Sequence, residues 1–155
     1  RLKTDGTVLE GIQNGNRLPS VPKFQLALSA FYNMPIDIGS GANAFVGVTF
    51  QHVGTRYTQP GDQEDNTRTL VHDVRFGGAP ANAPPTLDLK LPDYQLVNLS
   101  AGIEMDNGLD IIAYINNLFD ENALLAFDRE RGGRARLGFS TNQPRTYGLT
   151  VRKAF

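Results

Sequence analysis

The chain contains no cysteine, so it cannot form a disulfide framework or a cysteine-based zinc or thiol site. It also has no run of roughly 18 apolar residues, which excludes a membrane-spanning helix but leaves a membrane-spanning barrel open. Acidic and basic side chains nearly balance, at a net charge of −1. Because nucleic-acid-binding proteins usually carry a strong basic excess, we do not expect this chain to bind nucleic acid.

Helix patterns are almost absent, since apolar residues do not recur at the three- and four-residue spacing of a helix face. Apolar and polar residues alternate instead, as in residues 143–155, where Tyr147, Leu149 and Val151 are separated by small or polar residues. This period of two is typical of strands. It predicts strands over residues 23–33, 44–57, 93–105, 108–119 and 143–155, with the end of a further strand over residues 7–12.

The length of these five segments favours a membrane protein. A tilted strand crosses a bilayer with roughly 9–11 residues, whereas soluble strands usually have about 5–6. In four of the segments one side is apolar, and the other is rich in Gly, Ser, Asn, Gln and Thr. Residues 108–119 are apolar on both sides, so their faces are not assigned. The apolar and polar faces suit lipid and a wet lumen, respectively. We therefore predict an all-β protein, an antiparallel transmembrane β-barrel, with a soluble β-sandwich as the alternative.

The connections between the predicted strands alternate between short and long. Asp106, Asn107 and Gly108 predict a tight type I′ turn, because Asn-Gly supplies the positive φ angles that this turn requires. Residues 34–43 form a second short link, whereas residues 58–92 and 120–142 form long polar stretches. Outer-membrane barrels combine short periplasmic turns with long external loops in this way.

Four segments carry a family resemblance. They are G-N-R-L-P-S-V-P-K (15–23), L-P-D-Y-Q-L-V-N-L-S-A-G (91–102), I-N-N-L-F-D (115–120) and Q-P-R-T-Y-G-L-T-V-R-K-A-F (143–155). In order and spacing, the set resembles the C-terminal end of TonB-dependent outer-membrane receptors, over residues 15–155. The motif residues are Asn117, Leu118, Phe119, Asp120, Pro144, Arg145 and Thr146.

The resemblance implies a larger barrel of about 22 strands, plugged by an N-terminal domain. Residues 1–155, which begin at Arg1 and not at Met, would be the C-terminal part of the barrel domain, with its last five or six strands. The plug domain and the earlier strands would lie outside this chain. The expected function is energy-coupled uptake of a scarce ligand, such as an iron–siderophore complex, cobalamin or a carbohydrate, across the outer membrane of a Gram-negative bacterium.

No enzymatic activity, metal or cofactor is expected, and no catalytic triad or metal-ligand spacing is evident in the sequence. The implied partners are the TonB complex (through the missing N-terminal region), the barrel-assembly machinery, the remainder of the same barrel, outer-membrane lipid with lipopolysaccharide, and a small-molecule ligand. A passive porin, a small structural outer-membrane barrel and a soluble β-sandwich carbohydrate-binding module remain the alternatives.

The final strand is expected to close the barrel and to be read by the assembly machinery, through Tyr147, Leu149, Val151 and Phe155, with Phe155 as the true C-terminus. Lys153 departs from the apolar alternation. At the end of the chain we expect it at the membrane interface, where a lysine costs only about 0–1 kcal/mol.

Charged residues outside this strand supply weaker candidates. A basic patch in the second long stretch, which could bind lipopolysaccharide phosphates or an anionic ligand, contains Arg129, Arg131, Arg134 and Arg136. An acidic group that lacks the spacing of a calcium loop, and that we expect to be a solvated loop tip, contains Asp62, Glu64, Asp65 and Asn66. Glu104, Asp110 and Arg152 are expected to face inward, toward a plug.

Overall fold

The computed structural model describes residues 14–39, 41–63, 88–129 and 137–154. Within these ranges the secondary structure consists of β-strands and one short 3-10 helix. No helix in the described ranges is long and apolar enough to span a bilayer. The chain divides into two compact units, one of which holds all five long strands.

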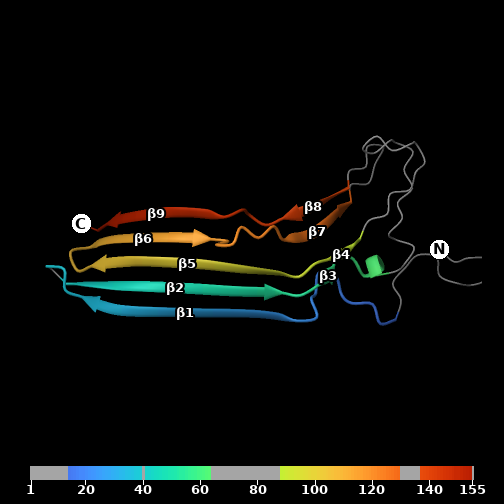
Figure 1. Ribbon diagram of the computed structural model, residues 1–155, viewed down its shortest axis with the longest axis horizontal. Coiled ribbons are helices and arrows are strands. Elements are labelled where there is room, and N and C mark those ends of the chain that lie inside the picture. Colours follow the sequence, from blue (N-terminus) through green and yellow to red (C-terminus); the bar gives the residue numbers. More distant parts are fainter. Residues whose placement is uncertain (1–13, 40, 64–87, 130–136, 155) are drawn as a thin grey trace, which may run out of the picture. The chain divides into compact units, whose positions relative to one another are not determined.

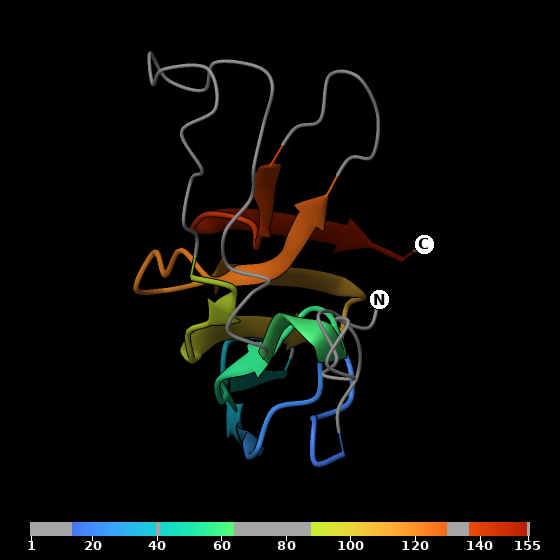
Figure 2. The same cartoon turned by 90° about the vertical axis from the view of Figure 1, so that its right-hand side faces the viewer.

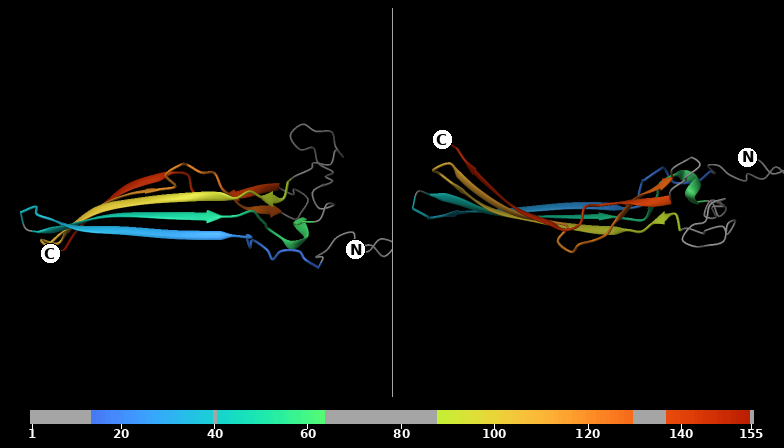
Figure 3. Two further views of the ribbon diagram at one scale, coloured as in Figure 1. Left: turned by 60° about the horizontal axis from the view of Figure 1, so that its bottom comes forward. Right: turned by 90° about the horizontal axis from the view of Figure 1, so that it is seen from above.

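The unit with the long strands is a single antiparallel sheet in the order β1-β2-β5-β6-β9 (Figure 1). Its strands are β1 (Gln25–Ile36), β2 (Ala42–Val53), β5 (Tyr94–Met105), β6 (Leu109–Asn116) and β9 (Thr146–Lys153). In both views of Figure 3, β1 and β2 run side by side along their whole length. All five predicted long strands are therefore confirmed, while residues 7–12 lie outside the described residues.

Tight turns join the strands at one end of this sheet. The β5–β6 turn is closed by a 2.9 Å hydrogen bond from the amide of Gly108 to the carbonyl of Met105. Gly108 has a φ of 81°, whereas Asn107 does not have a positive φ. The predicted type I′ turn is therefore wrong: this is a three-residue loop that ends in a left-handed glycine. The side chain of Asn107 is used differently, because its Oδ1 accepts a hydrogen bond from the amide of Leu109.

The second unit comes from the segment before β1 and from the long segments between the strands of the sheet. It contains the pair β3 (Arg56–Tyr57) and β4 (Lys90–Leu91), the 3-10 helix η1 (Pro60–Gln63), β7 (Leu124–Arg129) and most of β8 (Leu137–Thr141), which pairs with β7. Figure 2 shows η1 (green) directly after β3. The long stretches predicted only as loops thus contain strands of their own.

A small core holds this second unit together. Leu89 and Leu91 are fully buried, and Phe127 is nearly so. The ring of Phe127 packs against Phe139 at a centroid distance of 5.1 Å. Arg56 is also buried, and its Nη2 donates a 2.8 Å hydrogen bond to the carbonyl of Leu124. The apolar contacts and the hydrogen bond of Arg56 hold the loop segments together. The hydrogen bond also gives the buried guanidinium a partner, which buried polar groups require.

Candidate functional site

The five-stranded sheet has one apolar face, and this face is exposed. The strand register aligns its side chains in rows, such as Val46–Ala101–Ala113–Leu149 and Val48–Leu99–Ile115–Tyr147. The apolar side chains of β9, at the edge of the sheet, are exposed to solvent: Tyr147 is 80% exposed, Leu149 66% and Val151 60%. An exposed apolar surface of this extent is abnormal for a soluble monomer and marks a surface that something apolar covers.

The other face of the sheet is polar, and on it glycines are paired across strands with aromatic residues. One row reads Phe31–Gly47–Ser100–Tyr114–Gly148 across the five strands. A β-carbon at Gly148 would lie 2.5 Å from the hydroxyl oxygen of Tyr114, so the tyrosine ring occupies the space that the glycine leaves. Gly47 is covered in the same way by Phe31, and Gly102 by Phe45. In each of these cross-strand pairs, an aromatic ring from one strand occupies the space beside a glycine of the next strand.

A charged row crosses the same face near the tight turns. It aligns Asn43, Glu104, Asp110 and Arg152. The prediction that Glu104, Asp110 and Arg152 share one face therefore agrees with the register, including Asp110, which sequence pattern alone did not place. Glu104 lies directly opposite Asp110 on the neighbouring strand. Two carboxylates in this position repel each other and destabilise the sheet unless a cation lies nearby. Arg152 is the next residue in the row and supplies one positive charge.

The I-N-N-L-F-D motif forms a turn at the other end of β6. Asn117 is 5% exposed and has a φ of 53°, a conformation that asparagine tolerates better than most residues. Its Nδ2 donates to the carbonyls of Glu121 (2.9 Å) and Gln143 (3.0 Å). Its Oδ1 accepts from the amide of Glu121 at 2.8 Å. One side chain thus ties the end of β6 to the segment that leads into β9.

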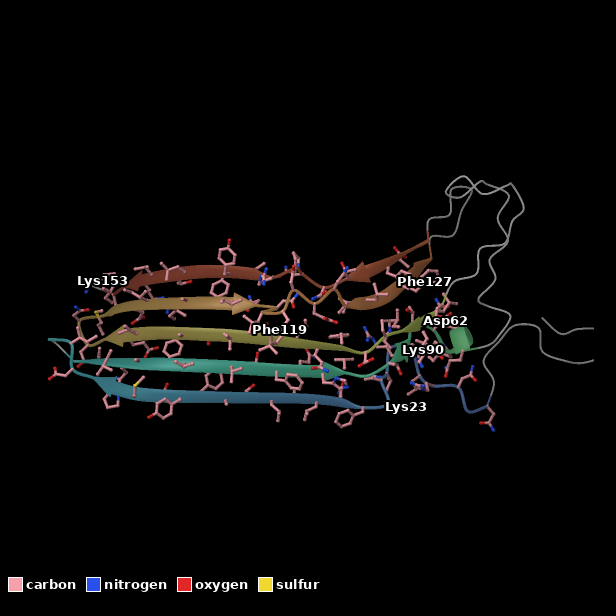
Figure 4. The ribbon with its side chains drawn as sticks, in the orientation of Figure 1. Lys23, Asp62, Lys90, Phe119, Phe127 and Lys153 are labelled. Carbon is pink, nitrogen blue, oxygen red and sulfur yellow. The ribbon has the colours of Figure 1, made fainter. Side chains whose placement is uncertain are left out.

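The rest of the motif completes the same connection. The amide of Leu118 donates to the carbonyl of Val97 at 2.8 Å. Asp120, at a φ of 56°, accepts a 2.8 Å hydrogen bond from the amide of Arg145 through Oδ1. Phe119, labelled in Figure 4, is 72% exposed. Asn117, Leu118 and Asp120 thus form hydrogen bonds within this connection, and Arg145, from residues 144–146, is bonded to Asp120.

The final strand carries the residues predicted for barrel closure. Tyr147, Leu149 and Val151 lie on the apolar face of β9, whereas Phe155 lies outside the described residues. Lys153 is labelled in Figure 4 at the end of β9. Its Nζ donates to the carbonyl of Asn107, and the amide of Ala154 donates to the carbonyl of Gly108. The lysine that broke the apolar pattern thus attaches the last strand to the neighbouring turn.

Most residues of the basic patch and of the acidic group lie outside the described residues. Arg129 ends β7, and Arg131, Arg134 and Arg136 lie outside the described residues, as do Glu64, Asp65 and Asn66. Asp62 is fully buried, and its Oδ2 accepts a hydrogen bond from the amide of Gln59. The expectation of a solvated loop tip is therefore wrong for Asp62. Among the described residues, no group of three or more His, Cys, Asp and Glu side chains is placed to hold a metal ion.

Sequence reasoning missed the polar residues that complete the turn. Asn98 of β5 donates from Nδ2 to Oγ1 of Thr49 and accepts the amide hydrogen of Asn117 through Oδ1. Asn142 accepts from the amide of Ala123 and donates to the carbonyl of Glu121. In the sequence each is one polar residue among many. Only the strand register shows that Asn98 faces the end of β6.

Comparisons with known proteins agree with this architecture. Residues 3–118 match the family model described as "TonB dependent receptor-like, beta-barrel". Among solved structures, the chain is similar to the ferric yersiniabactin uptake receptor FyuA from Yersinia pestis, with a TM-score of 0.60 and 23% sequence identity. That match covers 91% of this chain and 17% of the receptor, so the chain spans less than a fifth of that protein. No curated protein matches the chain.

Proposed function

The chain belongs to the family of TonB-dependent receptor-like β-barrels, and from this membership we propose that it forms part of the wall of an energy-coupled uptake receptor in the outer membrane of a Gram-negative bacterium. In this proposal, residues 1–155 are the C-terminal part of the barrel domain, and the remaining strands and the plug belong to the rest of the receptor. The receptor binds and moves its ligand without enzymatic chemistry or a cofactor.

The exposed apolar face is the observation that carries the proposal. Within the described residues, the five long strands form one sheet, and its apolar rows are open over β1, β2 and β9. Burial of these side chains in hydrocarbon removes their contact with water. This burial stabilises the protein by about 25 cal/mol for each Å² of apolar surface. Lipid supplies this burial in an outer-membrane barrel, where strands alternate apolar-out and polar-in.

The polar face supports a filled lumen in this proposal. Glu104 and Asp110 lie opposite each other, so a cationic group from a plug would reduce their repulsion. The plug would also supply the segment that contacts the TonB complex, and its rearrangement would open the path for the ligand.

We propose an iron chelate as the first ligand class to test, with cobalamin and carbohydrate as the other classes. The support is the similarity to a ferric yersiniabactin uptake receptor. The long connections would contribute to the external ligand-binding surface, and the arginines at positions 129, 131, 134 and 136 would favour an anionic ligand there.

An uptake assay in cells tests the proposal. The gene for the intact receptor is deleted, and uptake of radioactive iron is measured with siderophores from the growth medium, with and without a functional TonB complex. We expect the deletion and the loss of TonB to lower uptake to the same level. Uptake that persists without TonB but requires the receptor would indicate a passive porin instead. A receptor absent from the outer-membrane fraction would contradict the proposal as a whole.

A further inference from the structure

Three segments that lie far apart in the chain meet in the second unit. They are the segment before β1, the connection between β2 and β5, and the connection between β6 and β9. Residues 55–58, which we call the hub, belong to the second of these segments and are hydrogen-bonded to both of the others. The hub includes β3, whose two residues pair with β4. Its contacts therefore determine whether the three segments move separately or together.

One set of hub side chains binds β7. Arg56 is buried, and its Nη2 donates hydrogen bonds to the carbonyls of Leu124 and Leu125, at 2.8 and 3.2 Å. Two residues later, Oγ1 of Thr58 accepts a 2.7 Å hydrogen bond from the amide of Phe127. Hydrogen bonds from a charged donor are roughly twice as strong as those between neutral groups. Arg56 and Thr58 thus attach β7 to the hub at two points.

The other side of the hub binds the segment before β1. Cζ of Arg17 lies over the ring of Tyr57, 5.6 Å from its centroid, and Nη1 donates a 3.1 Å hydrogen bond to the carbonyl of Thr55. The amide of Ser20 donates to the carbonyl of Tyr57 at 2.8 Å. Successive side chains of an extended chain point to opposite faces, which explains why Tyr57 contacts Arg17 while its two neighbours contact β7. The hub is therefore held from both faces.

Gln63, at the end of η1, adds a second attachment to the segment before β1. Its Oε1 accepts a 3.1 Å hydrogen bond from the amide of Arg17, and its Nε2 donates a 3.2 Å hydrogen bond to the carbonyl of Arg17. Nδ2 of Asn16 donates to the carbonyl of Pro60 at 2.8 Å. The side-chain amide of Gln63 thus satisfies both backbone groups of Arg17, as a neighbouring strand would.

We propose that these three segments form one cooperative unit that opens and closes as a whole, coupled by the hub. The inference rests on the proposed uptake function, in which the long connections contribute to the external ligand-binding surface. Leu91, which is fully buried, lies opposite Arg56 and adds apolar burial to the hydrogen bonds of the hub. A ligand that contacts one segment would stabilise all three, because binding to the closed state favours every segment that closes with it.

Hydrogen exchange of the intact receptor in detergent, measured by mass spectrometry without ligand, tests the coupling. Peptides that cover residues 16–23 and 124–129 report on the two segments that the hub joins. In the wild-type receptor both should exchange through one opening, with the same free energy and the same dependence on urea. Thr58→Val removes the acceptor for the amide of Phe127 and should accelerate exchange about tenfold in both peptides. Thr58→Ser keeps the hydroxyl group and is the matched control.

Faster exchange of both peptides in Thr58→Val, with wild-type rates in Thr58→Ser, supports the cooperative unit. Faster exchange confined to residues 124–129, unchanged exchange in both peptides, or an equal acceleration in Thr58→Ser overturns it. Separate openings in the wild-type receptor also overturn it, and this measurement needs no variant. Peptides from β5 are the reference for an intact sheet.

The exchange measurement is independent of uptake, so the two proposals can fail separately. Uptake that does not require the TonB complex would refute the proposed function and leave the cooperative unit standing. Separate openings in a receptor with TonB-dependent uptake would refute only the cooperative unit.

Discussion

At the scale of single residues, Asn117 makes the densest set of contacts in the family motif. It combines burial, a positive φ and three side-chain hydrogen bonds to the backbone at positions 121 and 143. Serine or threonine could not supply two donors and an acceptor from one planar group. The residue is therefore specified by geometry and not only by polarity.

Asn117→Ala should destabilise the intact receptor by about 3 kcal/mol, because two carbonyls and one amide lose their partners in a buried site. Urea titration of the receptor in detergent measures the free energy of unfolding. Asn116→Ala, at an exposed neighbouring position of β6, is the control and should cost about 0.5 kcal/mol or less. Equal effects of the two substitutions would refute the role assigned to Asn117.

The aromatic–glycine pairs make a second prediction at this scale. Gly148→Ala and Gly102→Ala should each cost about 1–3 kcal/mol through overpacking. A Tyr114→Leu background should relieve the first, because the three atoms nearest that β-carbon all belong to the tyrosine. A Phe45→Leu background should not relieve the second, because the carbonyl oxygen of Ile111 also lies 2.8 Å from the β-carbon at Gly102. Double-mutant cycles on unfolding free energies check both; additivity in the Gly148 cycle would contradict the pairing.

At the scale of the strand, β9 is defined by the difference between its two faces. Leu149 is exposed on the apolar face, while Thr150 is exposed on the polar face. Both lie near the middle of the strand, so their positions differ in face and hardly in depth. The pair therefore offers a direct measurement of which face meets hydrocarbon.

Leu149→Arg should cost about 2–4 kcal/mol, the penalty for a cation on the lipid side near the bilayer midplane. Thr150→Arg should change stability little, because a luminal arginine keeps its water. The measurement is the unfolding free energy of the receptor refolded in lipid vesicles. A larger penalty for Thr150→Arg than for Leu149→Arg would reverse the assignment of the faces.

At the scale of the whole molecule, the described sheet has two edges. Within the described residues, β1 pairs only with β2, and β9 pairs only with β6. Unpaired backbone groups cost several kcal/mol each in hydrocarbon, so an open sheet is unstable in a bilayer. The complete barrel would remove both edges by pairing β1 and β9 with further strands.

The isolated 155-residue chain should therefore aggregate in detergent-free buffer, whereas the intact receptor should be monodisperse in detergent. Size-exclusion chromatography with light scattering compares the two samples. A stable, detergent-free monomer of the isolated chain would show that the apolar face is covered within the chain itself, and would favour the soluble alternative.

The sequence predicted the five long strands because alternation is a local property that each segment carries by itself. It also identified the apolar face of β9 through Tyr147, Leu149 and Val151. It failed at the β5–β6 turn, where Asn-Gly is compatible with two turn types and backbone geometry selects one. It also failed at Asp62, since burial of one carboxylate depends on residues far along the chain.

By itself, the sequence determined which residues are extended and, for every long strand except β6, which side is apolar, because a period of two needs no information from other strands. β6 is apolar on both sides in the sequence, so only its partners assign its faces. Only the tertiary structure decided how the strands align, and register is what places Ala101 opposite Ala113 and Tyr114 opposite Gly148. A buried asparagine and an aromatic ring over a glycine are both products of neighbours that lie far apart in the chain. Their positions therefore follow from hydrogen bonding between strands, which no single segment encodes.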